Sequence, residues 1–348
     1  MSTTSSDINS TFQNAASGHL SFAAWRLPEE TDIQHITGIT TIKRFSEINF
    51  PAFVITPFDK KPGELLIIEK RERIEAEAHY SINPPQLSPI GKLDKNSYID
   101  LVKRGINAIQ KGDFQKVVLS RQLQIDFHES FNPVELFLQL VEAYPKAFVS
   151  LVSSPHTGTW IGASPELFIK KEKDFIQSIS LAGTIRSLEI ENGGKVSSKD
   201  QVEQEIVSQF IREKLTFLGM PYTESNPELI NTGNLNHIKT TFTAADPDSK
   251  LEHIIDTLHP TPAICGYPRD RSKDFILKHE KYSRILYGGL LGPVYSLQNA
   301  ELYVNLRCIQ IIENKGILYA GAGILSNSNA EEEWRETEYK MDTLRSFL

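Results

Sequence analysis

Two pairs of acidic residues are the most informative chemical feature of the sequence. Asp200 and Glu203 form one pair and Glu333 and Glu336 the other, each spaced three residues apart. Residues three apart share one face of an α-helix, so each pair concentrates negative charge that a cation would offset. The helix dipole favours acidic residues in any first turn, which accounts for a single pair. The second copy, in a chain without a His/Cys cluster at ligand spacing, favours a hard cation such as Mg²⁺.

A basic and an acidic residue in strand-like segments are candidates for proton transfer. Lys116 begins the alternating segment KVVLSR (116–121), where a lysine is either an exposed strand end or a buried amine. Burial would favour the neutral amine, which can act as a general base. Pro165 interrupts the strand-like residues 159–169, which indicates an edge or bulge that directs Glu166 to a particular place.

Two glycine-containing segments could bring backbone N–H groups close to an anion. They are LAGT (181–184) and Gly321-Ala322-Gly323, although turns use glycine for other purposes too. The net charge of −7 and the pI of about 5.8 argue against a basic surface for nucleic acid or anionic membranes. An anionic small substrate would therefore require local positive charge.

Helices and antiparallel strand pairs are expected to position these residues. Apolar periodicity predicts helices over 96–111, 134–142 and 198–219. The last would begin with a capping box of Ser198 and Gln201. Short connections favour antiparallel pairing of 148–152 with 159–169, and of 302–312 with 316–322. The sequence therefore predicts an α+β fold with large antiparallel sheets, without the Gly-rich turn of a dinucleotide or P-loop domain.

The chain is expected to form one domain behind a polar N-terminus. Residues 1–17 lack the basic and apolar regions of a signal peptide, and we expect them to be disordered. Residues 18–348 would form the single domain, with a less typical part at 18–90. The two cysteines form no CxxC motif, which fits a reducing compartment. Because no apolar stretch reaches roughly 20 residues, a soluble, cytoplasmic protein is expected.

Several segments occur in the order found in a known enzyme family. They are KVVLSR (116–121), GASPELF (162–168), LAGT (181–184), SKDQVEQE (198–205), HPTPAICGYP (259–268) and AGAGI…EWRETEYK (320–340). With them the chain, over about 94–347, resembles the chorismate-utilising enzymes, which include anthranilate synthase component I, aminodeoxychorismate synthase, salicylate synthase and isochorismate synthase. The resemblance implies a chorismate-binding fold of two large packed antiparallel sheets covered by helices, with the active site in a cleft between them.

The resemblance also implies a Mg²⁺ cofactor, which would hold the ring carboxylate of chorismate. Its expected ligands and neighbouring acids are Glu203, Glu336, Asp200 and Glu333. Lys116 matches the base that activates water for attack at C2, and Glu166 the acid that protonates the departing C4 hydroxyl. Arg307 and Tyr319 match groups that bind the enolpyruvyl carboxylate. The other expected pocket residues are Gly183, Thr184, His237, Thr240, Ala263, Gly321, Ala322, Gly323 and Lys340.

Within this family, Lys116 favours water over ammonia as the nucleophile, because the ammonia-using members resemble one another in placing a different residue there. The aminodeoxychorismate branch also has a lysine where this chain has Ala182. The expected activity is therefore that of an isochorismate synthase, with a product that feeds either menaquinone or siderophore biosynthesis. A monomer without an obligatory partner protein is expected, whereas an anthranilate or aminodeoxychorismate synthase component would need an amidotransferase.

Salicylate synthase is the main alternative, because it shares the lysine base and then eliminates pyruvate from isochorismate. Ala263 in HPTPA resembles the isochorismate synthases more closely. One departure from the family pattern is Gln204, which replaces a histidine that often follows the metal-binding glutamate. Glu280 and Arg284 resemble a structural pair beside the site.

Overall fold

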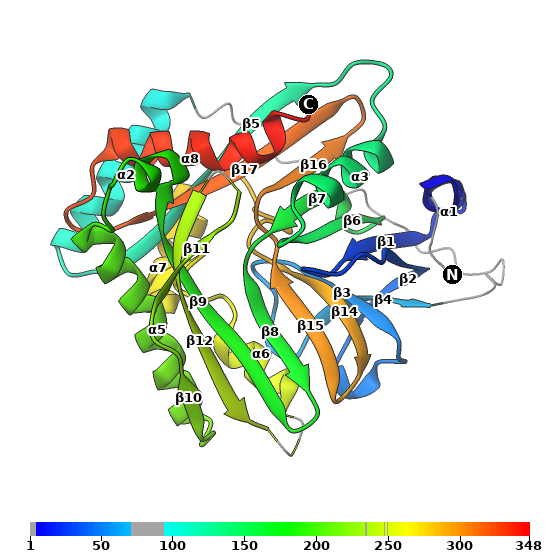
Figure 1. Cartoon of the computed structure of the whole chain (residues 1–348), viewed down its shortest axis with the longest axis horizontal. Helices are drawn as coiled ribbons and strands as arrows, with labels where there is room; N and C mark the ends of the chain where they lie inside the picture. The colour runs from blue at the N-terminus through cyan, green and yellow to red at the C-terminus, as the bar shows by residue number, and fades with distance from the viewer. Residues whose placement is uncertain (1–4, 71–93, 234, 247, 249) are drawn as a thin grey trace.

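Short apolar runs separated by turns form 17 strands in the part of the chain that the structure describes. The computed structural model describes residues 5–70, 94–233, 235–246, 248 and 250–348 (Figure 1). The strands are β1 (Ser21–Arg26), β2 (Gln34–Lys43), β3 (Ala52–Thr56), β4 (Leu65–Lys70), β5 (Lys116–Asp126), β6 (Phe148–Ser154), β7 (Gly158–Ser164), β8 (Leu167–Glu172), β9 (Phe175–Arg186), β10 (Tyr222–Glu224), β11 (Glu228–Asn231), β12 (Leu235–Ala245), β13 (Gly266–Tyr267), β14 (Leu290–Ser296), β15 (Asn299–Val304), β16 (Cys308–Ile312) and β17 (Lys315–Ile324).

The strands pair in one continuous antiparallel series. Its order is β12-β9-β8-β15-β14-β3-β4-β2-β1-β6-β7-β16-β17-β5, with β10 and β11 also on β12, and β13 on β5. The expected pairings of β6 with β7 and of β16 with β17 are confirmed. The α+β class is therefore correct. The two expected sheets are continuous with one another, because all the strands belong to this one series.

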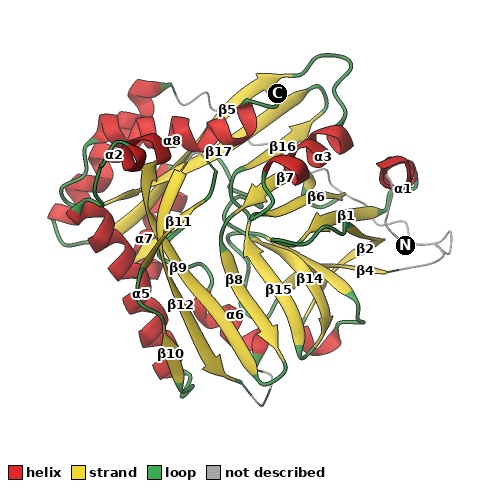
Figure 2. Cartoon of the chain, viewed as in Figure 1, coloured by secondary structure: helices red, strands yellow, loops and turns green. Residues whose placement is uncertain are grey.

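Helices cover the strands on the outside (Figure 2). They are α1 (Ser5–Ser17), α2 (Lys95–Gln110), α3 (Pro133–Ala143), α4 (Ser187–Glu191), α5 (Ser198–Phe217), α6 (Leu251–Leu258), α7 (Arg269–His279) and α8 (Ala330–Arg345). Helix α5 packs on β9 and β12, whereas α8 packs on β17 and against α2. The two helices with acidic pairs therefore lie over opposite ends of the strand series. None of the helices in the described ranges is long and apolar enough to cross a membrane.

A core rich in aromatic side chains lies between the strands. It includes Trp25, Phe53, Phe148 and Trp160, and consists of residues from strands and from the segment that contains Tyr282. Because its members come from β1, β3, β6 and β7 and from β14 to β17, it joins distant parts of the series. A rigid interior of this kind holds the strand ends that carry the candidate site.

The N-terminal prediction is wrong for residues 5–17, which form α1 and do not remain disordered; residues 1–4 lie outside the described ranges. Ile8, Phe12 and Ala15 are buried, and their spacing of four and three places them on one helix face. The ring of Phe12 meets that of Phe22 in β1 at 5.5 Å between centroids. This apolar stripe, hidden in a polar segment, anchors the helix to the sheet and to α3.

The start of α5 is shifted by one residue from the predicted capping box. Ser197, rather than Ser198, caps the helix, and its hydroxyl accepts a hydrogen bond from the Asp200 N–H at 3.1 Å. The Asp200 carboxylate accepts in return from the Ser197 hydroxyl at 2.6 Å. The reciprocal partner is therefore Asp200 and not Gln201, which gives one of the four predicted metal-site acids a capping role.

Candidate active site

A small cavity of about 60 Å³ lies where the two ends of the strand series meet. Strands β5 and β17 border it from one end of the series, and β9 and β12 from the other. The predicted residues that line it are Glu166, Gly183, Thr184, Glu203, His237, Ala263, Arg307, Tyr319, Gly321, Gly323 and Lys340. The predicted residues outside the lining are Lys116, Asp200, Thr240, Ala322, Glu333 and Glu336. The structure thus brings together segments from residue 118 to residue 340.

Lys116 lies directly behind the cavity, at the start of β5. Its side chain is fully buried, and its Nζ makes no hydrogen bond with the described residues. The Oε1 atom of Glu203 is 3.0 Å away. Gly323 makes this contact possible, because a Cβ at residue 323 would lie 2.0 Å from that oxygen and 3.1 Å from the Cε of Lys116. The lysine is therefore buried, as its candidate role as a base requires, and it faces a predicted metal ligand.

Glu166 follows β7 and is aimed into the cavity by the predicted interruption at Pro165. Its carboxyl is buried, and burial raises its pKa to about 8 against the opposing charges of Lys116, Lys340 and Arg307. The group is therefore mostly protonated near neutral pH. A protonated carboxyl that lines a cavity can donate a proton to a leaving group.

An extra residue in β9 shapes one wall of the site. His237 of β12 pairs with Thr184, but the next residue, Ile238, pairs with Ala182, so Gly183 is inserted as a bulge. Gly183 has a φ of +71°, and a Cβ there would lie 2.9 Å from the Cβ of Asp200. Glycine is thus required both for the backbone conformation and for the approach of α5. The bulge turns Thr184 and His237 towards the cavity.

Arg307 is a buried guanidinium without an acidic partner among the described residues. Its Nη1 donates to Thr343 at 3.1 Å and its Nη2 donates to the Nε2 of His237 at 3.1 Å. Since a guanidinium only donates, Nε2 of His237 must be the acceptor. Burial, followed by the charges of Arg307 and Lys340, holds the pKa of His237 well below its usual range. Arg307 therefore has neutral neighbours and can receive an anion.

The tyrosine that presents its hydroxyl to the cavity is Tyr287, which the sequence did not single out. A Cβ at Gly321 would lie 2.9 Å from the Tyr287 hydroxyl, and Tyr287 lines the cavity. Tyr319, the predicted residue, also lines it, but its hydroxyl donates to Gln310 at 3.0 Å and accepts from Gln122 at 3.1 Å. The two rings stack at 5.4 Å. Tyr287 belongs to none of the motifs that the sequence analysis used, so only the fold could reveal that it lines the cavity.

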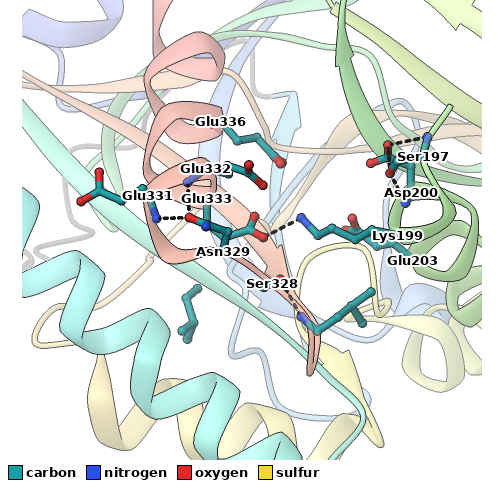
Figure 3. A network of polar contacts seen from close by, with 12 residues as sticks. Ser197, Lys199, Asp200, Glu203, Ser328, Asn329, Glu331, Glu332, Glu333 and Glu336 are labelled. Carbon is teal, nitrogen blue, oxygen red and sulfur yellow. Dashed lines mark hydrogen bonds and ion pairs between the residues drawn. The ribbon is translucent and has the colours of Figure 1, made fainter. Parts of the chain in front are cut away.

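The acidic residues of α5 and α8 face one another, but each already has an internal partner (Figure 3). Glu333 accepts from Lys199 at 2.5 Å, and Glu336 accepts from Lys340 at 2.6 Å. Burial and Glu336 raise the pKa of Glu333 to about 7. Among the described residues, no three His, Cys, Asp or Glu side chains are arranged to hold a metal ion. The predicted metal-ligating carboxylates of the two helices are therefore close to one another, but lysine ammonium groups pair with them.

Gln204 and Thr240 belong to a polar network behind the cavity. The Nε2 atom of Gln204 lies 2.8 Å from the hydroxyl of Thr240, 3.0 Å from that of Ser180 and 2.9 Å from that of Ser208. The network links α5 to β9 and β12 beside Glu203. The departure from the family pattern at Gln204 thus supplies a buried, uncharged anchor for the helix.

Glu280 and Arg284 form the structural pair that the sequence suggested. The guanidinium donates to both oxygens of Glu280, at 2.6 and 2.8 Å, and to the carbonyls of Ile264 and Val118. Glu280 accepts from the Ser120 N–H at 2.7 Å. This pair fixes the segment after Ala263 against β5, so that Ala263 and Ile264 line the cavity.

Comparisons with known proteins give one consistent family. Residues 55–348 match the family model described as "Chorismate binding enzyme". The isochorismate synthase EntC of Escherichia coli K12 is 32% identical over 309 residues, which cover 83% of this chain and 78% of that protein. The vibriobactin-specific isochorismate synthase of Vibrio cholerae is 29% identical, covering 84% and 78%. A crystal structure described as a putative 2,3-dihydroxybenzoate-specific isochorismate synthase, DhbC, from Bacillus anthracis aligns with a TM-score of 0.78 at 25% identity, covering 94% and 96%.

Proposed function

Because the chain belongs to the chorismate-binding enzyme family, we propose that it is an isochorismate synthase, an enzyme that adds water at C2 of chorismate and releases the C4 hydroxyl. The relatives described above carry that name and extend over most of the chain. Salicylate formation, which would require a further elimination of pyruvate, is an alternative outcome of the assay below.

The observation that carries the proposal is a matched acid and base beside one cavity. Lys116 is buried without a hydrogen bond, and Glu166 has a pKa of about 8. The Lys116 amine would take a proton from the attacking water, while Glu166 gives its proton to the C4 hydroxyl, which leaves as water. As the C2–O bond forms, the C1=C2 double bond moves to C1=C6 and the C5=C6 double bond moves to C4=C5, while the C4–O bond breaks, so atoms and charge balance. Groups in such positions typically contribute about 10²–10⁴-fold each.

Arg307 supports the proposal as the anchor for the enolpyruvyl carboxylate. Its guanidinium has two neutral partners, His237 and Thr343, and burial lowers its pKa to about 10, where it remains charged at neutral pH. A carboxylate would provide the anionic partner that this buried cation lacks. Tyr287 would donate to the same end of the substrate, and the ring of Tyr319, whose hydroxyl is engaged by Gln122 and Gln310, would pack against the Tyr287 ring.

The proposal includes Mg²⁺ as the cofactor. Glu203 and Glu336 are the residues that would hold it, with Glu333 and Asp200 beside them; the donor set fits, since carboxylate oxygens are the ligands that Mg²⁺ prefers. A cation already lies between the helices in the form of the Lys199 ammonium. When bound, Mg²⁺ would neutralise the ring carboxylate and orient the ring. Lys340, which donates to Gly321 O at 2.9 Å, fixes Glu336 for that task.

We further propose a cytoplasmic enzyme that acts without an amidotransferase. Cys265 and Cys308 are free and buried, which fits a reducing compartment. The family resemblance implies that a lysine at the position of Lys116 activates water and not ammonia.

The decisive experiment incubates the purified full-length protein with chorismate and Mg²⁺ in the absence of ammonia. Products are separated by chromatography, with fluorescence detection for salicylate. We expect a mixture of chorismate and isochorismate that is reached from either compound, because the isomerisation is reversible. Lys116→Met serves as the control for background conversion.

Two outcomes would replace this function. Salicylate and pyruvate that accumulate irreversibly would make the chain a salicylate synthase. Turnover that begins only when an ammonium salt is added would show that Lys116 does not determine the nucleophile and would place the chain among the amine-forming members.

A further inference from the structure

Lysine side chains occupy the space between the carboxylates of α5 and α8. Lys116 faces Glu203, and Lys340 faces Glu336. Lys199 faces Glu333 (Figure 3). Lys116 is fully buried, and Lys340 lies one turn from Glu336 on the same helix. Neither of these pairs connects the two helices.

Lys199 differs because it crosses from one helix to the other. It belongs to the first turn of α5, whereas Glu333 belongs to the first turn of α8, and the two atoms are 2.5 Å apart. Its ammonium therefore compensates a carboxylate of the opposite helix, one turn from the proposed metal ligand Glu336.

Lys199 can also reach solvent. Its side chain is 22% exposed, compared with 18% for Lys340 and 0% for Lys116, while its partner Glu333 is 1% exposed. A turn of the side chain outward would place the ammonium in water and leave the buried Glu333 without its cation, beside Glu336, which keeps Lys340. A divalent cation at that position would restore the balance with twice the charge.

From this arrangement we propose that Lys199 is a built-in competitor of Mg²⁺: its ammonium holds α5 against α8 in the metal-free enzyme and must leave the carboxylates when the cation binds. This inference rests on the Mg²⁺ part of the proposed function. It explains why the donors adjoin and yet no three of the described acidic side chains form a metal site. By linkage, bound Mg²⁺ weakens the contact of Lys199 with the carboxylates by some factor. Removal of Lys199 must then strengthen Mg²⁺ binding by the same factor.

The test compares Mg²⁺ binding by the full-length wild type and the Lys199→Met variant, measured by titration calorimetry with Mg²⁺ alone. Coupling energies of this kind usually change affinity by roughly 5–150-fold, and we expect tighter binding in the variant by a factor in this range. Thermal melts in EDTA provide a second readout. There we expect a lower Tm for Lys199→Met, because the buried Glu333 loses the cation that ties it to α5, and a larger rise in Tm when Mg²⁺ is added.

Lys95→Met is the matched control. Lys95 also pairs with an acid in the first turn of α8, Glu331, at 2.7 Å, but both side chains are about half exposed, at 51% and 49%. We expect this variant to keep the wild-type affinity for Mg²⁺ and the wild-type Tm in EDTA, because exposed pairs contribute little. Lys199→Gln replaces the methionine variant if that protein does not fold.

Three results would overturn the inference in distinguishable ways. Wild-type and Lys199→Met proteins that bind Mg²⁺ equally would show that the lysine does not compete. Weaker binding by the variant would make Lys199 a helper of the metal site. Absence of Mg²⁺ binding to either protein would remove the proposed cofactor as well, whereas the chorismate assay would still decide the reaction.

Discussion

Lys116 and Lys171 are both fully buried lysines on strands, but their surroundings differ. Lys171 of β8 donates to the carboxylate of Asp246 at 2.6 Å and to its carbonyl at 2.5 Å. Lys116 of β5 makes no hydrogen bond with the described residues and has only the nearby charge of Glu203. Lys171 therefore holds β8 to the segment at Asp246, whereas Lys116 is held only by a carboxylate that lines the cavity.

The same contrast separates two of the buried arginines, Arg26 and Arg307. Arg26 donates to five backbone carbonyls, one of the neighbouring Leu27 and four around the end of α3. Arg307 donates to two neutral side chains beside the cavity. Burial by itself therefore does not mark a functional residue in this protein; Arg307 differs from Arg26 in lining the cavity with only neutral side-chain partners.

The largest expected effect is the loss of turnover in Lys116→Met. Without the amine no group removes the proton from the attacking water, and we expect kcat to fall by about 10²–10⁴-fold. The measurement is the initial rate of isochorismate formation, with unfolding by urea as the check on the fold. A variant that keeps more than a tenth of the wild-type kcat would show that Lys116 is not the base and would break the comparison with Lys171.

The pH dependence of the wild type tests the acid that acts with Lys116. Glu166 has a pKa of about 8 and must be protonated to act as an acid, so kcat/KM should fall as the pH rises through about 8. Glu166→Gln should lose turnover by about 10²–10⁴-fold at every pH. A rate that stays level up to pH 9.5 would contradict the assignment of Glu166 as the acid.

Lys171→Met should affect stability and leave catalysis unchanged. The variant leaves the Asp246 carboxylate buried without its cation, and we expect the free energy of unfolding to fall by about 3–5 kcal/mol. Denaturation by urea measures this change, and kcat and KM of the folded protein should remain at wild-type values. The double variant with Asp246→Leu should recover part of the stability. A loss of kcat in Lys171→Met would erase the difference between the two lysines.

The smallest expected effect separates Tyr287 from Tyr319. Tyr287→Phe should raise the KM for chorismate by roughly tenfold or more, because a hydrogen bond to a charged group contributes about 1.5–3 kcal/mol. Tyr319→Phe should leave KM unchanged and lower stability by about 1–3 kcal/mol, since Gln122 and Gln310 lose their shared partner. Steady-state kinetics of both variants measure these KM values. A KM that rises in Tyr319→Phe and not in Tyr287→Phe would return the role to Tyr319.

Much of the architecture followed from local patterns. The helices predicted over 96–111, 134–142 and 198–219 correspond to α2, α3 and α5, because a 3.6-residue apolar period and nearby glycines or caps are local signals. Short connections predicted the antiparallel pairs correctly. The cap of α5 differs by one residue, since Ser197 and Ser198 offer the same hydroxyl and only backbone geometry selects between them.

The order of motifs along the chain determined the family and the identity of most candidate residues, including Lys116, Glu166 and Glu203. The tertiary structure decided which of them have unused hydrogen-bonding capacity. It placed Tyr287 at the cavity while Gln122 and Gln310 engage the hydroxyl of Tyr319, and it put the Lys199 ammonium between the helices. These features depend on contacts between residues far apart in the chain, 134 positions for Lys199 and Glu333. Residue type and local spacing do not encode burial or the direction of a side chain, so only the folded chain could define them.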